Sequence, residues 1–143
     1  MPLYDPMWET EHWKVILAED QTYLGRGVIS LKRRPCTSLT ELRDDELLDL
    51  RNNVIVPYEA AVKKAFGAEL FNWSCLMNNA YQNTPPDPHV HWHVWPRYRN
   101  PVEVAGEKFV DEYFGYYLSL DKKRAVSLEL RQVIESMILA SRS

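Results

Sequence analysis

The chain has 143 residues, enough for one domain with a sizeable core. Hydrophobic residues make up 45% and charged residues 26%, a balance typical of globular proteins and not of disordered ones. The formal net charge of -3 argues against a nucleic-acid-binding protein, because such proteins usually carry a basic face. The net charge is still compatible with binding of a small anionic ligand, because such a ligand needs only a few local hydrogen-bond donors.

The sequence carries no feature that predicts export or membrane insertion. The first ten residues include Asp5 and Glu9, and no apolar segment follows them, so we expect no secretory signal. No apolar run approaches the roughly 20 residues of a membrane helix. Cys36 and Cys75 form no CxxC motif, which argues against a zinc knuckle. We expect a cytoplasmic protein without a membrane partner.

Short apolar stretches predict the strands of a sheet. The first two are separated by a polar turn, which favours an antiparallel pair. Pro96 is expected to close the last strand, and the turn-rich segment 78–88 before that strand is expected to be a loop. The predicted strands cover residues 13–18, 23–32, 70–77 and 89–95.

Two stretches have the apolar spacing of helices. The first begins at the capping-box pattern Ser38 to Glu41 and ends near Gly67, with Pro57 predicting a kink or a split. The second follows Ser127, a suitable N-cap near the C-terminus. Together these elements predict an α+β fold, in which an antiparallel sheet packs with one long kinked helix and a C-terminal helix.

Three of the four histidines, His89, His91 and His93, alternate along one predicted strand. Side chains alternate between the faces of a strand, so the three imidazoles should share one face. Trp95 would continue that face, whereas Trp92 should point into the core. With only four histidines in the chain, chance is a poor explanation of this alternation.

A metal site and a nucleophilic site both explain the alternation. Histidines two residues apart stand about 6.6 Å from each other and can share one metal, but the outer two are about 13 Å apart. Alternatively, a neutral imidazole attacks phosphorus and splits one difficult displacement into two steps. Crowding favours neutral imidazoles, because like charges repel, and the flanking rings can donate to phosphate oxygens. We favour the nucleophilic site.

Two further polar groups in the sequence bear on phosphate binding. Asn78 and Asn79 follow a predicted strand, where their amides are equally well explained by a ligand contact or by turn chemistry. The basic run Lys32 to Arg34 ends another strand, and the sequence alone favours a solvated strand end there.

The segment His89 to Tyr98 (HVHWHVWPRY) resembles the signature of the histidine triad family, including the Pro-Arg that often follows it. Upstream, Tyr23 to Arg34 is similar to the family's Gly-His strand, and Leu39 to Leu42 to its helix start. The resemblance covers about residues 8–98 of a single domain spanning 1–143, with 99–143 as a C-terminal extension. Within the family, it is nearest to the branch of fragile-histidine proteins and dinucleoside polyphosphate hydrolases.

This resemblance implies that His91 is the nucleophile and that His89 and His93 assist it. It also implies that Asn78 contacts phosphate, because it stands eleven residues before His89, where the fragile-histidine branch carries a glutamine. Glu19 is the nearest candidate for the ribose contact. Family members are usually homodimers and require no metal on the nucleophile, so we expect a homodimer without a required cofactor, with a divalent metal entering only with the substrate phosphates.

The chain departs from the family pattern at four places. Arg26 and Arg34 replace two histidines, and Ala18 stands near the place of the ribose-binding acid. Pro85 and Pro86 replace the residues that assist the leaving group, a role that then passes to the loop segment 82–84.

The sequence therefore predicts a nucleotide hydrolase or transferase that acts on a phosphoanhydride or phosphoramidate, with a diadenosine polyphosphate as the first substrate to test. The intermediate would be a nucleotidyl group on His91. Two alternatives stay open: a nucleotide-binding sensor with little turnover, and a metal-dependent hydrolase that uses the His89/His91 pair.

Overall fold

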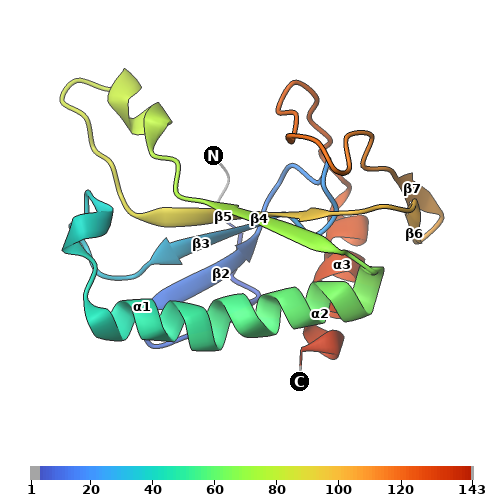
Figure 1. Cartoon of the computed structure of the whole chain (residues 1–143), viewed down its shortest axis with the longest axis horizontal. Coiled ribbons are helices and arrows are strands. Elements are labelled where there is room, and N and C mark those ends of the chain that lie inside the picture. The colour runs from blue at the N-terminus through green and yellow to red at the C-terminus, as the bar shows by residue number, and fades with distance from the viewer. Residues whose placement is uncertain (1–3, 143) are drawn as a thin grey trace.

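The chain folds around a five-stranded antiparallel sheet in the computed structural model, which describes residues 4–142 (Figure 1). The sheet order is β1-β2-β3-β5-β4, and a second sheet contains β6 and β7. The predicted α+β class and the antiparallel first pair are confirmed. The main-sheet strands are β1 (Trp8–Glu9), β2 (Trp13–Leu17), β3 (Gly27–Leu31), β4 (Leu70–Ser74) and β5 (His91–Arg97).

The long helix forms as one helical run, as predicted, although its α-helical part starts later than predicted. Ser38 caps only a short 3-10 helix, η1 (Leu39–Glu41), and the α-helical part begins later, at Asp44. The run then consists of α1 (Asp44–Leu50), a π-helical turn η2 (Arg51–Ile55) and α2 (Val56–Phe66). Gly67 ends it in the left-handed conformation, as predicted.

Pro57 neither breaks the helical run nor splits it in two. Proline has no N–H, so the carbonyl of Asn53 one turn earlier loses its usual helical donor. The indole N–H of Trp8 donates to that carbonyl at 3.3 Å. The wider π-helical turn directly before Pro57 makes room for its ring.

The triad strand is shifted from its predicted position by two residues. β5 begins at His91 rather than His89 and continues through Pro96 instead of ending before it. Pairing with β3 ends where Gly27 lies opposite Val94, so only β4 lies beside β5 at Pro96. Proline is tolerated there because that part of β5 is no longer a central strand.

The remaining elements surround the two ends of β5. The predicted loop 78–88 contains a 3-10 helix, η3 (Asn78–Gln82). After β5, a small hairpin of β6 (Val102–Val104) and β7 (Glu107–Phe109) forms, which the sequence analysis did not predict. The C-terminal helix α3 (Leu128–Ser141) is confirmed, and the Ser127 hydroxyl accepts from the N–H of Leu130 at 3.1 Å. No helix within residues 4–142 is long and apolar enough to cross a membrane.

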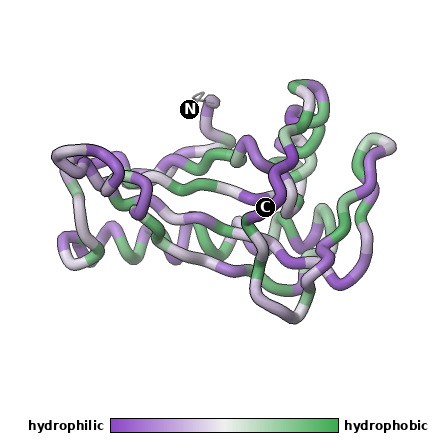
Figure 2. Tube along the Cα trace, turned by 90° about the horizontal axis from the view of Figure 1, so that it is seen from above, coloured by the Kyte–Doolittle hydropathy of each residue, from purple (hydrophilic) through white to green (hydrophobic). Residues whose placement is uncertain are grey.

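The two faces of the main sheet have different coverings. The core face packs against the long helix through buried residues such as Trp13, Val15, Leu17, Ile29 and Val94. We call the opposite side the histidine face; it carries Lys14, Ile16, Val28, Ser30, Asn72, Ser74, His91, His93 and Trp95. Hydrophobic and hydrophilic residues alternate along these strands (Figure 2).

Candidate functional site

Strand β5 brings His91 and His93 together on the histidine face. Their ring centroids lie 5.0 Å apart, with the planes at 75°. Trp95 continues the row, stacked on His93 with centroids 5.3 Å apart and planes at 24°. The predicted alternation is thus confirmed within the strand. The intervening Val94 is fully buried, and Trp92 packs against the core, as expected.

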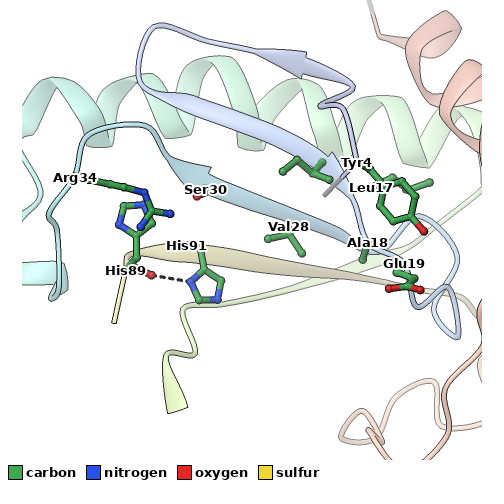
Figure 3. A pocket seen from close by; sticks show the side chains of 10 residues that line it. Tyr4, Leu17, Ala18, Glu19, Val28, Ser30, Arg34, His89 and His91 are labelled. Carbon is green, nitrogen blue, oxygen red and sulfur yellow. Dashed lines mark hydrogen bonds between the residues drawn. The ribbon is translucent and has the colours of Figure 1, made fainter. Parts of the chain in front are cut away.

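His89 lies just before β5, yet its ring enters the same cavity as His91 (Figure 3). Its Nε2 donates to the carbonyl of Leu31 at 2.7 Å, which fixes the ring orientation. The remaining nitrogen, Nδ1, is buried and has no partner in the described residues. Burial lowers the pKa of His89, as do the charges of Arg34 and His91, while the bond to Leu31 opposes them.

His91 is held in one tautomer by the backbone. Its Nδ1 lies 2.7 Å from the carbonyl oxygen of His89, and a carbonyl only accepts, so Nδ1 carries the proton (Figure 3). In the neutral ring the lone pair is then on Nε2. The Nε2 lone pair of neutral His91 is therefore free of the backbone contact, and the ring needs no change of tautomer to use it.

His93 sits in a less polar environment than a surface histidine. Burial lowers its pKa from 6.5 to about 4, and the Coulombic effects of neighbouring His91 and Arg26 act in the same direction. Its Nδ1 is buried without a partner in the described part of the chain. His93 is therefore neutral at pH 7, in agreement with the expectation that crowded histidines disfavour protonation.

A cavity of about 210 Å³ opens beside His91 on the β2–β3 side. Arg34 and His89 line one end, and Tyr4, Ala18 and Glu19 line the other (Figure 3). The wall between the two ends is mostly apolar and includes Ile16, Leu17 and Val28. The arrangement combines a cationic end, an imidazole and an apolar section, which suits a phosphorylated organic ligand.

The structure brings Glu19, but not Asn78, into this cavity. Glu19 lines the end opposite His89. Asn78 is exposed at the first residue of η3, and it does not line the cavity. Strand β4 ends at Ser74, so Asn78 does not directly follow a strand as the sequence pattern suggested.

Arg34 differs from the other two members of the basic run. Lys32 pairs with Glu9 at 3.3 Å, and Arg33 pairs with the buried Glu46 at 2.8 Å. Between residues 4 and 142, Arg34 has no ion pair, and it faces the cavity beside His89. Lys32 and Arg34 are exposed, as a solvated strand end requires, whereas Arg33 is half-buried against Glu46. Arg34 differs from Lys32 in that it also lines the cavity. The only sequence signal for it was the replaced family histidine.

A second cationic group, Arg26, lies at the Trp95 end of the row formed by His91, His93 and Trp95. Its guanidinium stands over the ring of Trp95 at 5.1 Å and pairs with Asp20 at 3.0 Å. Burial opposes ionisation of Asp20, but hydrogen bonds from Arg124 and Thr22 and the charge of Arg26 lower its pKa overall. In the sequence, Arg26 is recognisable only as a departure from the family pattern, because its contact with Trp95 depends on the pairing of separate strands.

Arg97, which follows the triad in the Pro-Arg pair, is a structural anchor. Its side chain is only 1% exposed and forms two bonds to Asp111, at 2.7 and 3.1 Å. It also donates to the side chain of Asn72 and to the carbonyls of Tyr113 and Tyr116. Arg97 thereby fixes the segment 111–116 against the end of β4 and β5.

The triad itself does not form a metal-binding cluster. Within residues 4–142, no group of three or more His, Cys, Asp or Glu side chains is placed to hold a metal ion.

Comparison with known proteins identifies the fold. No family model and no curated protein matches the sequence. Among solved structures, a hypothetical histidine triad nucleotide-binding protein from Sulfolobus tokodaii is 17% identical with a TM-score of 0.67, covering 94% of this chain and 80% of that one. A histidine triad protein from Bradyrhizobium japonicum is 14% identical with a TM-score of 0.70, and the match covers 96% of this chain and 90% of that one. A zinc-bound histidine triad family protein from Mycobacterium smegmatis is 19% identical with a TM-score of 0.61, and the match covers 94% of this chain and 83% of that one. The chain shares the fold of these histidine triad proteins.

Proposed function

We propose that the protein is a nucleotide hydrolase or transferase of the histidine triad family, with His91 as its nucleophile. The observation that carries this proposal is the 2.7 Å bond from His91 Nδ1 to the His89 carbonyl, which leaves the Nε2 lone pair free for attack. The shared fold and the nucleotide-binding name of the Sulfolobus protein support the choice of a nucleotide as ligand.

In the first step, Nε2 of His91 forms a bond to the α-phosphorus while the bond from that phosphorus to the leaving group breaks. The leaving group departs with the bonding electron pair. In the second step, water attacks the phosphorus, the bond to Nε2 breaks, and a nucleoside monophosphate is released with loss of one proton to solvent. If phosphate replaces water as the acceptor, a nucleoside diphosphate forms.

The residues around His91 have distinct proposed roles. Arg34 attracts the phosphate oxygens at the His89 end of the cavity, where negative charge grows in the transition state. Glu19 at the opposite end accepts hydrogen bonds from the ribose hydroxyls. His89 and His93 orient the phosphoryl group, and Asn78 would reach a phosphate only by a movement of η3.

The leaving group decides which substrate class is preferred. A nucleotide or polyphosphate departs as a stable anion and needs no proton, whereas an amine must be protonated as it leaves. Pro85 and Pro86, at the place of the family's assisting residues, have no acidic proton to donate. We therefore rank diadenosine polyphosphates ahead of adenosine phosphoramidates. Nucleotidyl sulfates, which also release a stable anion, are a further candidate class. We further propose that the protein is a homodimer in the cytoplasm. It requires no cofactor, and any divalent metal enters with the substrate phosphates.

The test is turnover of diadenosine tri- and tetraphosphate and of adenosine phosphoramidate, with and without chelator, in the wild type and in His91→Ala. We expect wild-type turnover in chelator and a loss of at least roughly a thousandfold in His91→Ala. Acid-free trapping of the wild type with radiolabelled substrate should place the nucleotidyl group on His91.

Two outcomes would replace this proposal. Loss of wild-type activity in chelator, together with stoichiometric bound metal, would favour a metal-dependent hydrolase using His89 and His91; the zinc-bound Mycobacterium structure motivates that control. Tight nucleotide binding without turnover of any substrate would favour a sensor. Retention of most activity in His91→Ala would exclude His91 as the nucleophile.

A further inference from the structure

A second groove lies on the histidine face, across β5 from the cavity already described. It measures about 490 Å³ and lies between β4, the end of β5 and residues 115–118. Trp95 and Ser74 line it, and both lie next to His93, Trp95 by ring stacking and Ser74 as its cross-strand partner. We call it the β4 groove. His91 thus lines the first cavity, and the groove on the other side of β5 is lined by neighbours of His93.

The outer wall of the β4 groove is fixed in place by the protein itself. Arg97 donates to the carbonyls of Tyr113 and Tyr116 at 2.9 and 3.1 Å, and its bonds to Asp111 hold the start of the same segment. Further along, the N–H of Ser119 donates to the hydroxyl of Tyr23 at 2.8 Å. The segment between these anchors rises above the sheet beside β5 (orange in Figure 1). The groove is thus a built feature of the fold.

The groove presents aromatic rings and one oriented amide. The side chains of Tyr116 and Tyr117 line it and are 79% and 91% exposed, so their rings are free to stack on a ligand. The Oδ1 atom of Asn72 accepts from Arg97 at 3.0 Å, which leaves the Asn72 NH₂ as the donor facing other partners. Because Arg97 is neutralised by Asp111, the groove offers no free cation to a phosphate. Exposed aromatic rings with a hydrogen-bond donor suit a flat, polar aromatic group such as a nucleobase.

We propose that the β4 groove binds the second nucleoside of a dinucleoside polyphosphate, the half that leaves when His91 attacks the other half. This inference rests on the proposed function of His91. Trp95 stands four residues from His91 along β5, roughly 13 Å. A polyphosphate chain with its ribose spans such a distance. One nucleoside can therefore occupy the cavity lined by His91 and Glu19 while the other stacks on Tyr116 and Tyr117. The enzyme would then favour substrates with a nucleoside on both sides of the phosphates.

The test compares two substrates that differ only on the leaving side. Diadenosine tetraphosphate fills both cavities, whereas adenosine phosphoramidate has an amine as its leaving group and cannot reach the β4 groove. We expect Tyr116→Ala and Tyr117→Ala each to lower kcat/KM for diadenosine tetraphosphate by roughly tenfold, the size of one base–aromatic stack, without changing kcat/KM for the phosphoramidate. Tyr117→Phe keeps the ring and should retain wild-type selectivity. Leu128→Ala, an exposed apolar truncation on α3, is the matched control and should change neither substrate.

The outcomes separate this inference from the proposed function. Equal losses on both substrates, or no loss on either, would overturn the β4 groove as a subsite while leaving His91 in place. A change from dimer to monomer in Tyr116→Ala or Tyr117→Ala, measured by sedimentation, would show instead that a second copy of the chain occupies the groove. If the wild type turns over neither substrate, calorimetry decides: diadenosine tetraphosphate should bind more tightly than adenosine monophosphate, and Tyr117→Ala should abolish that difference. Equal affinities in the wild type would overturn the inference.

Discussion

The two faces of the main sheet obey different rules for buried polar atoms. On the core face, the buried indole nitrogen of Trp92 has no partner in the described residues, but other buried polar groups are paired. The indole N–H of Trp13 donates to the carbonyl of Glu46 at 2.9 Å, and the helix residue Tyr58 donates to Gly25 at 2.6 Å. The guanidinium of Arg33 donates two hydrogen bonds to the carboxylate of the buried Glu46. This is the normal state of a protein interior, because an unpaired buried polar atom is destabilising.

The histidine face departs from that rule. In the described residues, six buried side-chain nitrogen or oxygen atoms have no partner, and five of them belong to this side of the sheet: Arg26 Nε, Ser74 Oγ, His89 Nδ1, His93 Nδ1 and Trp95 Nε1. The sixth is the indole nitrogen of Trp92. Such a concentration beside a row of imidazoles marks a candidate functional site, because protein interiors rarely leave buried polar atoms unpaired. The two faces therefore differ in kind: the core face is packed by apolar side chains, whereas the histidine face keeps unpartnered polar atoms beside its imidazoles.

The largest test of this contrast is a pair of truncations in adjacent residues of β2. Trp13 is fully buried on the core face, so Trp13→Ala should lower the free energy of unfolding by about 3–5 kcal/mol through lost burial and an empty cavity. Lys14→Ala, on the histidine face, should change it by less than about 0.5 kcal/mol. Urea denaturation at pH 7 measures both. Comparable losses in the two variants would break the contrast.

A second test uses pH, because the two faces should lose stability in different windows. His93 has a folded pKa of about 4 against an ordinary 6.5, so the unfolded state binds more protons between these values. Stability should therefore fall as the pH drops from 6.5 toward 4, by up to about 1.4 kcal/mol per pH unit from this residue. Glu46 has its pKa lowered to about 2 by the hydrogen bond from Arg33, so its contribution is lost only below about pH 4.5.

His93→Gln separates the two windows. It should flatten the loss of stability between pH 6.5 and 5, with the remainder coming from His89, whose pKa is also lowered. The decline below pH 4.5 should stay as in the wild type. Denaturation curves at half-unit pH steps test this, and an unchanged slope above pH 5 would show that His93 titrates normally in the folded protein.

The smallest test removes one hydroxyl from each side. Ser74→Ala deletes a buried oxygen without a partner and should raise the free energy of unfolding by about 1 kcal/mol. Tyr58→Phe deletes a buried hydroxyl that donates to Gly25 and should lower it by about 1 kcal/mol. The sign, measured by the urea midpoint, is the result that matters. Destabilisation by Ser74→Ala would mean that the Ser74 hydroxyl has a water partner and that the histidine face is satisfied after all.

Local patterns in the sequence were sufficient for most of the fold. The alternation His89-Val-His-Trp-His predicted both the strand and the common direction of its histidines, because side-chain direction in a strand depends only on residue parity. Gly67 and Ser127 marked helix ends, since capping is a property of a few consecutive residues. The contact that compensates for Pro57 could not be predicted. The carbonyl of Asn53, which Pro57 leaves without a helical donor, accepts from Trp8, a residue 45 positions away.

Only the tertiary structure decided how the site is completed. The sequence by itself determined the nucleophile candidate His91 and its neighbours, which are adjacent along one strand. It did not determine that Glu19 shares a cavity with His91, that Arg34 alone of the basic run is free to face it, or that Asn78 lies outside it. The β4 groove is a still stronger case, because its lining combines β4, the end of β5 and residues 115–118, and Arg97 holds that last segment through Asp111 and the carbonyl of Tyr116. These contacts join residues from separate elements, and their distances depend on strand order and loop anchoring, which no local pattern specifies.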